Sequence, residues 1–224
     1  MKLPEKKMIL WFVFFMAIFG VACFILVIVK DRTYFHSTPY IKKSDKSSEV
    51  LVIYYSRSGN TEAMAREIAR KFDADIIKID AEKYPLDLQG WRNAGTDADQ
   101  KITQVAIKPE KVDMKKYNLI FLGSPIWWFR PAPPLWTFVL KNNFKGKNVI
   151  LFNTFNSRFK NEEIEEFKEL VTKKEGRFID HVYVRRGRVY YQKSGETLMK
   201  EAREVVEEKL NTWRTKIILK ENQI

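Results

Sequence analysis

The sequence predicts a three-layer, doubly wound α/β fold with a parallel sheet of five strands, preceded by one transmembrane helix. Three observations support this prediction. Short apolar runs alternate with stretches of helical spacing, which is typical of a parallel sheet covered by helices on both faces. A polar turn containing glycine connects the first of these runs to a helix. A long uncharged apolar run stands near the N-terminus.

The apolar run covers residues 8–29. As a helix it would extend roughly 33 Å at about 1.5 Å per residue, which is enough to cross a bilayer. Apolar residues continue past Cys23, where a cleaved signal peptide or a lipoprotein signal ending at Cys23 would turn polar, so a retained single-pass anchor is favoured over both alternatives. Cys23 is the only cysteine, which excludes an intramolecular disulfide.

Basic residues flank this run on both sides and leave its orientation open. Lys2, Lys6 and Lys7 precede it, and Lys30 and Arg32 follow it. The short basic tail over residues 1–7 slightly favours an N-terminus inside the cell, which would leave the globular part outside the cytoplasm. The sequence therefore predicts a cell-membrane protein and does not determine the side of its globular domain.

Residues 30–48 are polar and without periodicity, which predicts a linker.

The chain is basic, with a net charge of +12. Residues 1–46 contain eight basic and three acidic side chains, so residues 47–224 keep a net charge of +7. Basic and acidic residues are interspersed there and no nucleic-acid-binding motif is present. We therefore expect a lipid bilayer, and no nucleic acid, as a partner.

The first strand is predicted over residues 50–55, and a helix begins at about Thr61 with Met64, Ile68 and Phe72 on one face. The turn between them reads Ser-Arg-Ser-Gly-Asn-Thr. It places hydroxyl and amide donors at a helix N-terminus, where phosphate binds readily. Gly59 allows a positive φ or a close backbone approach. The spacing matches neither the dinucleotide fingerprint nor the nucleoside-triphosphate loop.

The remaining elements follow with regular alternation. Further strands are expected over residues 74–80, 118–122, 148–152 and 177–185. Helices are expected near 86–100, from Asn161 and from Ser194 to about Trp213, before a C-terminal tail over 214–224. In the long connection over 81–117, Tyr84 and Trp91 are expected to pack rather than to bind a ligand. The globular domain is thus expected over 49–213.

An aromatic loop follows the third strand, from Ser124 to Pro131. In a sheet with strand order 2-1-3-4-5, strands 1 and 3 flank the point where the order reverses, so this loop should meet the polar turn after the first strand. Such a loop has little interior to fill. We therefore expect Trp127 or Trp128 to stack on a planar ligand, with the choice between them open. Arg130 is expected to be a solvated surface residue, with a charge near the ligand as the alternative.

A third loop, 153–159, should lie at the same edge of the sheet. Its polar Thr154, Asn156 and Ser157 are candidate ligand contacts, Phe155 is a candidate cover for a ring, and Arg158 is a further candidate charge. His181, in the last strand, is expected at a sheet edge or in a polar contact rather than as an acid or base.

Two of these loops resemble the flavodoxin family. Residues 56–61 match at every fixed position the family's FMN-phosphate pattern, [ST]-x-[ST]-G-x-T, and residues 123–128 match G-x-P-x-W-W, the second flavin loop of one subset. The resemblance covers about 49–213 and implies FMN as cofactor, with the third loop closing over the flavin. The cofactor-binding residues implied are Ser56, Arg57, Ser58, Gly59, Asn60, Thr61, Ser124, Pro125, Ile126, Trp127, Trp128, Thr154, Phe155 and Asn156.

The sequence contains no Ser/His/Asp or Cys/His arrangement, no metal-ligand spacing and no pair of catalytic carboxylates, so the chemistry is expected from the cofactor. The function expected is that of a membrane-anchored FMN-binding protein in electron transfer, working with a redox partner protein or a membrane quinone. The alternatives are an NAD(P)H-dependent quinone or flavin reductase and a cofactor-free, membrane-tethered binding module.

Overall fold

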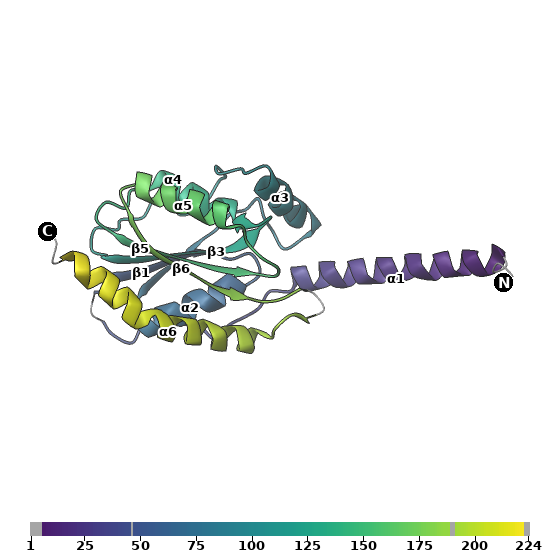
Figure 1. The fold of residues 1–224 in the computed structure, drawn as a ribbon, viewed down its shortest axis with the longest axis horizontal. Coiled ribbons are helices and arrows are strands. Elements are labelled where there is room, and N and C mark those ends of the chain that lie inside the picture. Colours follow the sequence, from purple (N-terminus) through teal and green to yellow (C-terminus); the bar gives the residue numbers. More distant parts are fainter. Residues whose placement is uncertain (1–5, 46, 189–190, 222–224) are drawn as a thin grey trace.

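The computed structural model describes residues 6–45, 47–188 and 191–221. Residues 49–221, which we call the domain, form three layers around a parallel sheet with strand order β2-β1-β3-β5-β6. Helices α3, α4 and α5 cover one face of the sheet, and α2 and α6 cover the other (Figure 1). The strands are β1 (Val50–Tyr55), β2 (Asp75–Ile79), β3 (Leu119–Trp127), β4 (Arg130–Pro131), β5 (Asn148–Phe155) and β6 (Arg177–Arg185). The helices are α1 (Lys6–Arg32), α2 (Asn60–Phe72), α3 (Leu88–Asp99), α4 (Pro133–Lys141), α5 (Asn161–Lys173) and α6 (Gly195–Glu221).

The predicted fold class and strand order are confirmed, because alternate residues of each strand face the two helical layers. In β1, Leu51, Ile53 and Tyr55 pack in the core beneath α4 and α5. Val52 and Tyr54 pack in the opposite core, beneath α2 and α6. A strand buried on both faces is apolar throughout, and this is why its limits were correctly predicted.

The aromatic segment after the third strand differs from the predicted loop. β3 continues to Trp127, pairs with β5 through Pro125 and Thr154, and then turns back into β4. The short β4 is the sixth strand, absent from the prediction of five. Two prolines at the start of α4 supply the fixed φ that suits the first turn of a helix, and this helix is a further addition to the predicted elements.

The C-terminal helix also extends beyond its predicted end. α6 continues to Glu221, so the expected tail over 214–224 is helical as far as the structure describes it. The reason lies in the continued spacing of apolar residues. Trp213 is buried and Ile217, one turn later, packs against the same core.

α1 projects from the domain as a single exposed helix (Figure 1). Residues Lys6–Leu26 are long and apolar enough to cross a membrane, with a mean hydropathy of 2.8, and none of this stretch is buried. A signal sequence near an N-terminus can also be long and apolar enough to meet this criterion.

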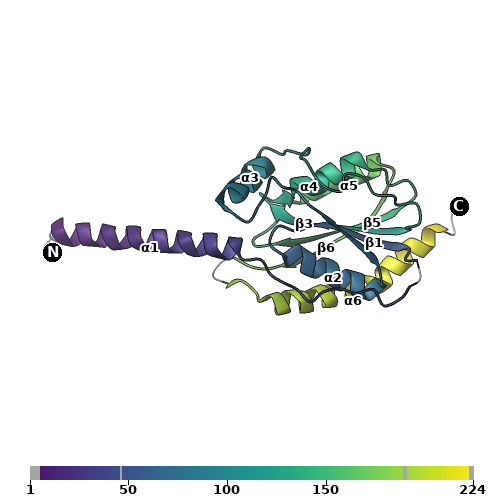
Figure 2. The same ribbon diagram turned by 180° about the vertical axis from the view of Figure 1, so that it is seen from behind.

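The linker after α1 has no helix or strand but is held on the domain. We call residues 33–45 the strap. It runs along the face that carries α2 and α6 (Figure 2), and Phe35 and Tyr40 pack against that core. Its polar contacts include Phe35 N to Ser58 O (2.9 Å), Arg66 Nη1 to Ser37 O (2.6 Å), Tyr40 Oη to Ala74 O (2.9 Å) and Lys42 Nζ to Asp75 Oδ1 (2.7 Å).

Candidate functional site

A cavity of about 650 Å³ opens where β1, β3 and β5 end. This volume lies within the usual range of small-molecule sites. Its walls are the turn after β1, the β3–β4 hairpin, the loop after β5 and one face of α3. The predicted site residues that line it are Ser56, Arg57, Ser58, Asn60, Thr61, Pro125, Ile126, Trp127, Trp128, Thr154, Phe155 and Asn156. The structure therefore brings together three loops that are far apart in the sequence.

The turn after β1 has the shape of an anion site. Gly59 has a φ of +83° and is the N-cap of α2, where no side chain caps the helix. The first N–H groups of a helix without a side-chain cap can donate to a ligand, and they carry part of the positive end of the helix dipole. Asn60 Nδ2 donates to Ser58 Oγ at 2.9 Å, which holds the turn in shape.

Gly59 is required for a reason that the sequence did not show. A Cβ at this position would overlap the carbonyl oxygen of Phe35 in the strap. The close backbone approach expected at Gly59 is therefore made by the chain's own strap, on the side of the turn away from the cavity. Gly59 itself does not line the cavity.

A pair of threonine hydroxyl groups lies in the cavity wall. Thr61 Oγ1 and Thr154 Oγ1 lie 2.7 Å apart, and both residues are buried in the walls of the cavity. One hydroxyl of such a pair donates to the other, and the second keeps its own proton for a ligand. The pair also joins the turn after β1 to the loop after β5.

Arg57 lines the cavity and also has a positioning role. Its Nη2 donates to the carbonyl oxygens of Pro85 (2.9 Å) and Asp87 (3.2 Å). Asp87 in turn caps α3 by accepting from Gly90 N at 2.7 Å. Arg57 thereby fixes the start of α3 beside the phosphate-type turn.

The β3–β4 hairpin presents two tryptophans in different environments. Trp127 packs edge-on against Tyr55 and Tyr84, with ring centroids 5.5 Å and 5.1 Å apart. Trp128 is 59% exposed. Trp128 and Phe129 form the two-residue turn and have φ values of +46° and +71°, which fits the turn type that β-hairpins favour. Bulky residues rarely adopt this conformation, and where they do the site is frequently functional.

Ser124, which was predicted to contact the cofactor, is not among the residues that line the cavity. The strand continues past its expected end, so Ser124 is a fully buried residue paired with Asn153. Ser124 Oγ accepts from Ala132 N at 3.2 Å, and Asn153 Nδ2 donates to Ser124 O at 2.7 Å. Ser124 thus stabilises the hairpin through its hydrogen bond with Ala132.

His181 completes this network and makes the polar contact expected of it. Its Nε2 lies 2.9 Å from Asn153 Oδ1, and it belongs to the edge strand β6. The amide nitrogen of Asn153 already donates to Ser124, so its oxygen accepts from His181. Burial lowers the pKa of His181 to about 4 from its ordinary value of 6.5, although the neighbouring Asp180 opposes this shift.

This depressed pKa predicts a loss of stability in mild acid. Between pH 6.5 and 4 the unfolded chain binds a proton at His181 and the folded chain does not, so stability falls as the pH falls through this window. We expect the free energy of unfolding to drop by about 1–2 kcal/mol between pH 7 and pH 5 from this group. Urea unfolding of His181→Gln, which can still donate to Asn153, should show a flatter pH dependence. Equal slopes in the two proteins would contradict the prediction.

Arg130 lies neither on the surface nor at the cavity, which corrects both expectations. It is 1% exposed, its guanidinium stacks on Trp136 at 4.4 Å, and its Nε lies 3.0 Å from Glu163 Oε2. Burial lowers the pKa of Arg130 from its ordinary value, and the charges of Glu163 and Glu166 oppose this effect. Arg130 connects β4 to the first turn of α5 and so stabilises the hairpin.

The loop after β5 closes one side of the cavity, as predicted. Phe155 is nearly buried and packs against Phe159 and Tyr183 at 5.4 Å and 5.3 Å. Asn156, Ser157 and Arg158 line the cavity beyond it. Phe155 therefore supports the wall, and the polar residues after it face the open part.

Helix α3 contributes to the cavity wall, which its residues did not predict. Trp91, Arg92 and Asp99 line the cavity together with other residues of this helix. Trp91 is 44% exposed and does not pack as expected, whereas Tyr84 is buried and donates to Asp97 Oδ2 at 2.7 Å. The unusual length of the 81–117 connection was the one signal in the sequence that this segment could contribute to the site.

Among the described residues no group of three or more His, Cys, Asp or Glu side chains could hold a metal ion.

Comparisons with known proteins agree with this geometry. The flavodoxin family model matches residues 49–211. Among solved structures, the chain is similar to a flavoprotein in complex with FMN from Lactobacillus acidophilus NCFM (22% identity, TM-score 0.51, 61% of this chain and 93% of that one). It is also similar to a protein assigned as a flavoprotein from Bacteroides uniformis ATCC 8492 (22% identity, TM-score 0.57, 69% and 97%). No curated protein matches the chain significantly in sequence. With its match over most of the chain, its sheet order and its phosphate-type turn, this protein belongs to the flavodoxin family.

Proposed function

We propose that the protein binds FMN in this cavity and transfers electrons while anchored in a membrane by α1. One observation carries the proposal. The turn after β1, which has the family's phosphate pattern, opens into the same cavity as an exposed tryptophan and the polar loop after β5. Bound FMN supplies one- or two-electron transfer. The FMN complex of the similar Lactobacillus protein supports this choice of cofactor.

The residues of the chain fit this cofactor by their chemistry. The uncapped start of α2 and the hydroxyls of Ser56, Ser58 and Thr61 suit a phosphate. Trp128 offers an exposed ring for stacking, and Trp127 is already packed against tyrosines. The carboxylate of Glu62, in the first turn of α2, is turned away from the cavity toward Arg66 and Tyr34, so it does not repel an anion there.

The first test is the visible spectrum of the full chain purified in detergent. We expect a yellow protein, or one that takes up added FMN. A colourless protein that fails to bind FMN would leave the cofactor-free binding module as the explanation. Sedimentation of the untagged chain with carbonate-washed membranes tests the anchor separately, because an anchored protein stays in the pellet and a peripheral protein is released.

A second candidate function is an NAD(P)H-dependent quinone or flavin reductase. It is favoured by Arg92 and Arg158, which come from two different elements and line the cavity; guanidinium groups suit the phosphates of a nucleotide. Anaerobic addition of NADH or NADPH separates the two functions. Rapid bleaching of the flavin by either nucleotide would identify a reductase, and a slow response would support an electron carrier.

Replacing Thr61 by valine should weaken FMN binding without unfolding the domain. Valine has nearly the same shape, and its loss of a hydroxyl removes one hydrogen bond to a charged group, worth about 1.5–3 kcal/mol or roughly a 10- to 150-fold rise in Kd. Quenching of FMN fluorescence measures this Kd. Thr172→Val, on the exposed face of α5, is the matched control and should bind like the unmodified protein. Unchanged affinity in Thr61→Val would remove Thr61 from the site.

A further inference from the structure

We propose that the face around the mouth of the cavity docks on the surface of an anionic lipid bilayer. This docking face comprises the start of α3, the β3–β4 turn and the loops that follow β5 and β6. The inference rests on the proposed membrane anchoring by α1 and goes beyond it, because an anchor on a free linker would leave the domain able to turn in any direction.

The strap removes that freedom. α1 ends at Arg32, and three residues later Phe35 N donates to Ser58 O at 2.9 Å. Ser58 belongs to the turn that forms one wall of the cavity. The anchor therefore leaves the domain from the edge of the sheet that carries the cavity, and the C-terminus lies at the opposite end (Figures 1 and 2).

The length of α1 brings this edge to the level of the lipid headgroups. The apolar run ends at Val29 and the helix ends at Arg32. Three helical residues extend about 4.5 Å, which lies within a headgroup region of roughly 5–8 Å on each side of the hydrocarbon core. The strap contacts along α2 then hold the cavity edge toward the membrane.

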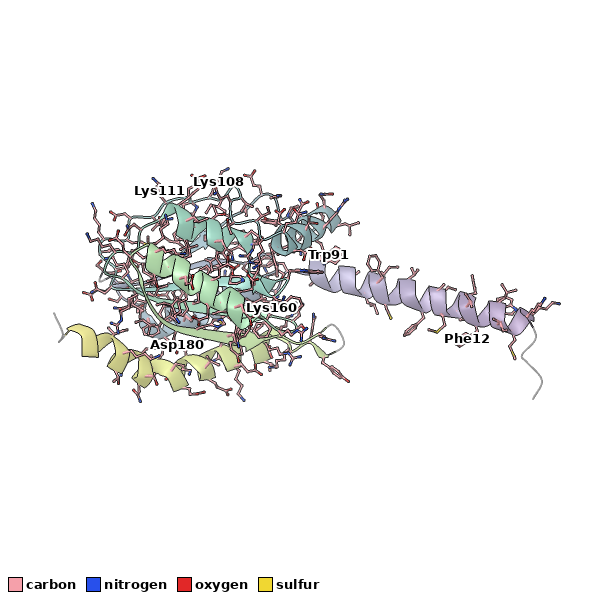
Figure 3. All side chains as sticks on the ribbon, turned by 45° about the horizontal axis from the view of Figure 1, so that its top comes forward. Phe12, Trp91, Lys108, Lys111, Lys160 and Asp180 are labelled. Atoms are coloured by element: carbon pink, nitrogen blue, oxygen red, sulfur yellow. The ribbon has the colours of Figure 1, made fainter. Side chains whose placement is uncertain are left out.

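Exposed apolar side chains gather on the docking face. Among the described residues outside α1, six large apolar side chains are exposed, and all but Ile41 lie at the carboxyl edge of the sheet. The five are Leu88 (48%), Trp91 (44%), Trp128 (59%), Tyr183 (45%) and Tyr191 (79%). Figure 3 shows Trp91 at the end of the domain from which α1 leaves. Tryptophan and tyrosine are the residues enriched at membrane interfaces.

Two segments of the docking face are basic. Segments 156–160 and 185–188 contain five basic side chains, Arg158, Lys160, Arg185, Arg186 and Arg188, and no acidic one. Basic groups at this level attract anionic headgroups. The amino edge of the sheet is also basic, with Lys115 and Lys145 exposed, but the described residues there include no exposed large apolar side chain. Aromatic and basic residues together distinguish the docking face and favour lipid over an acidic protein.

Spin labels on the full chain in liposomes test this proposal. A nitroxide on the native Cys23 reports on α1, and in the Cys23→Ala background the labels are placed by Trp91→Cys, Trp128→Cys and, as control, Lys145→Cys. We expect the labels at 91 and 128 in vesicles of phosphatidylcholine with phosphatidylglycerol to show a several-fold higher ratio of oxygen to water-soluble nickel accessibility than the label at 145. Labels at 91 and 128 that resemble position 145, with Cys23 in lipid, would overturn the docking alone. A water-exposed Cys23 would overturn the anchor and the docking with it.

Charge reversal provides a second measurement that leaves the cavity intact. Arg185→Glu combined with Arg188→Glu changes exposed residues outside the cavity lining. In anionic vesicles this double variant should lower the ratio of oxygen to nickel accessibility of the label at position 91 to that of a label in water. The matched control, Lys115→Glu with Lys145→Glu, should leave that label in the headgroup region. An equal response to both pairs would show that net charge rather than the docking face is responsible, and would overturn the proposal.

Discussion

Replacing Gly59 by alanine is expected to destabilise the domain by about 3 kcal/mol or more and to weaken FMN binding at the same time. A non-glycine residue at positive φ costs about 1–2 kcal/mol, and a steric clash with backbone adds to this cost. The new Cβ would overlap the Phe35 carbonyl oxygen, so the strap and the turn after β1 must separate. Urea unfolding and an FMN titration measure the two effects.

Gly146 provides the control for this experiment. It also has a positive φ, +71°, but no atom lies within 4 Å of the position that its Cβ would occupy. Gly146→Ala should therefore cost only the backbone term of about 1–2 kcal/mol and leave FMN binding unchanged. If Gly59→Ala and Gly146→Ala lower the free energy of unfolding equally, the strap does not contact the turn closely enough to exclude a Cβ at position 59. The coupling between the anchor and the phosphate-type turn would then be wrong.

Replacing Glu163 by alanine should cost about 3–5 kcal/mol, because it removes the nearest counter-charge of a buried guanidinium. Arg130 is 1% exposed, its Nε lies 3.0 Å from Glu163 Oε2, and the exposed Glu166 is farther away, with Oε1 3.8 Å from Nη2. Lys101 also contacts Glu163, at 2.8 Å, so the variant removes two ion pairs at once. The β3–β4 hairpin should loosen, and the expected readout is a lower midpoint in urea unfolding.

Two further variants distinguish burial from charge in this result. Glu165→Ala removes an exposed carboxylate from the same helix, where it pairs with Lys168 at 2.7 Å, and should change stability by about 0.5 kcal/mol or less. Arg130→Met combined with Glu163→Leu removes both buried charges and should recover most of the loss, since apolar replacements of a buried pair are often neutral. A Glu163→Ala variant as mild as Glu165→Ala would show that Arg130 is solvated in solution.

The sheet and the phosphate-type turn were predictable because their information is local. A strand buried on both faces is apolar at every position, so β1 over 50–55 has the limits that its residues predict. Likewise, hydroxyl, amide and glycine residues between a strand and a helix are sufficient to indicate an anion site. The order of the strands followed from the alternation of elements and from the resemblance to the flavodoxin family.

The parts that the sequence did not predict depend on contacts between distant segments. Ser124 resembles a ligand contact in the sequence, but pairing of β3 with β5 buries it behind the hairpin. In the sequence Arg130 is typical of a surface residue, but in the fold it is buried and pairs with Glu163 of α5.

Thus the sequence by itself determined the fold class, the apolar helix at the N-terminus and the turn that opens the site, because each follows from the spacing of neighbouring residues. Only the tertiary structure decided that the strap is pinned to that turn and that α3 lines the cavity. Both depend on polar contacts, Phe35 to Ser58 and Arg57 to Pro85, between residues that the chain separates by more than twenty positions.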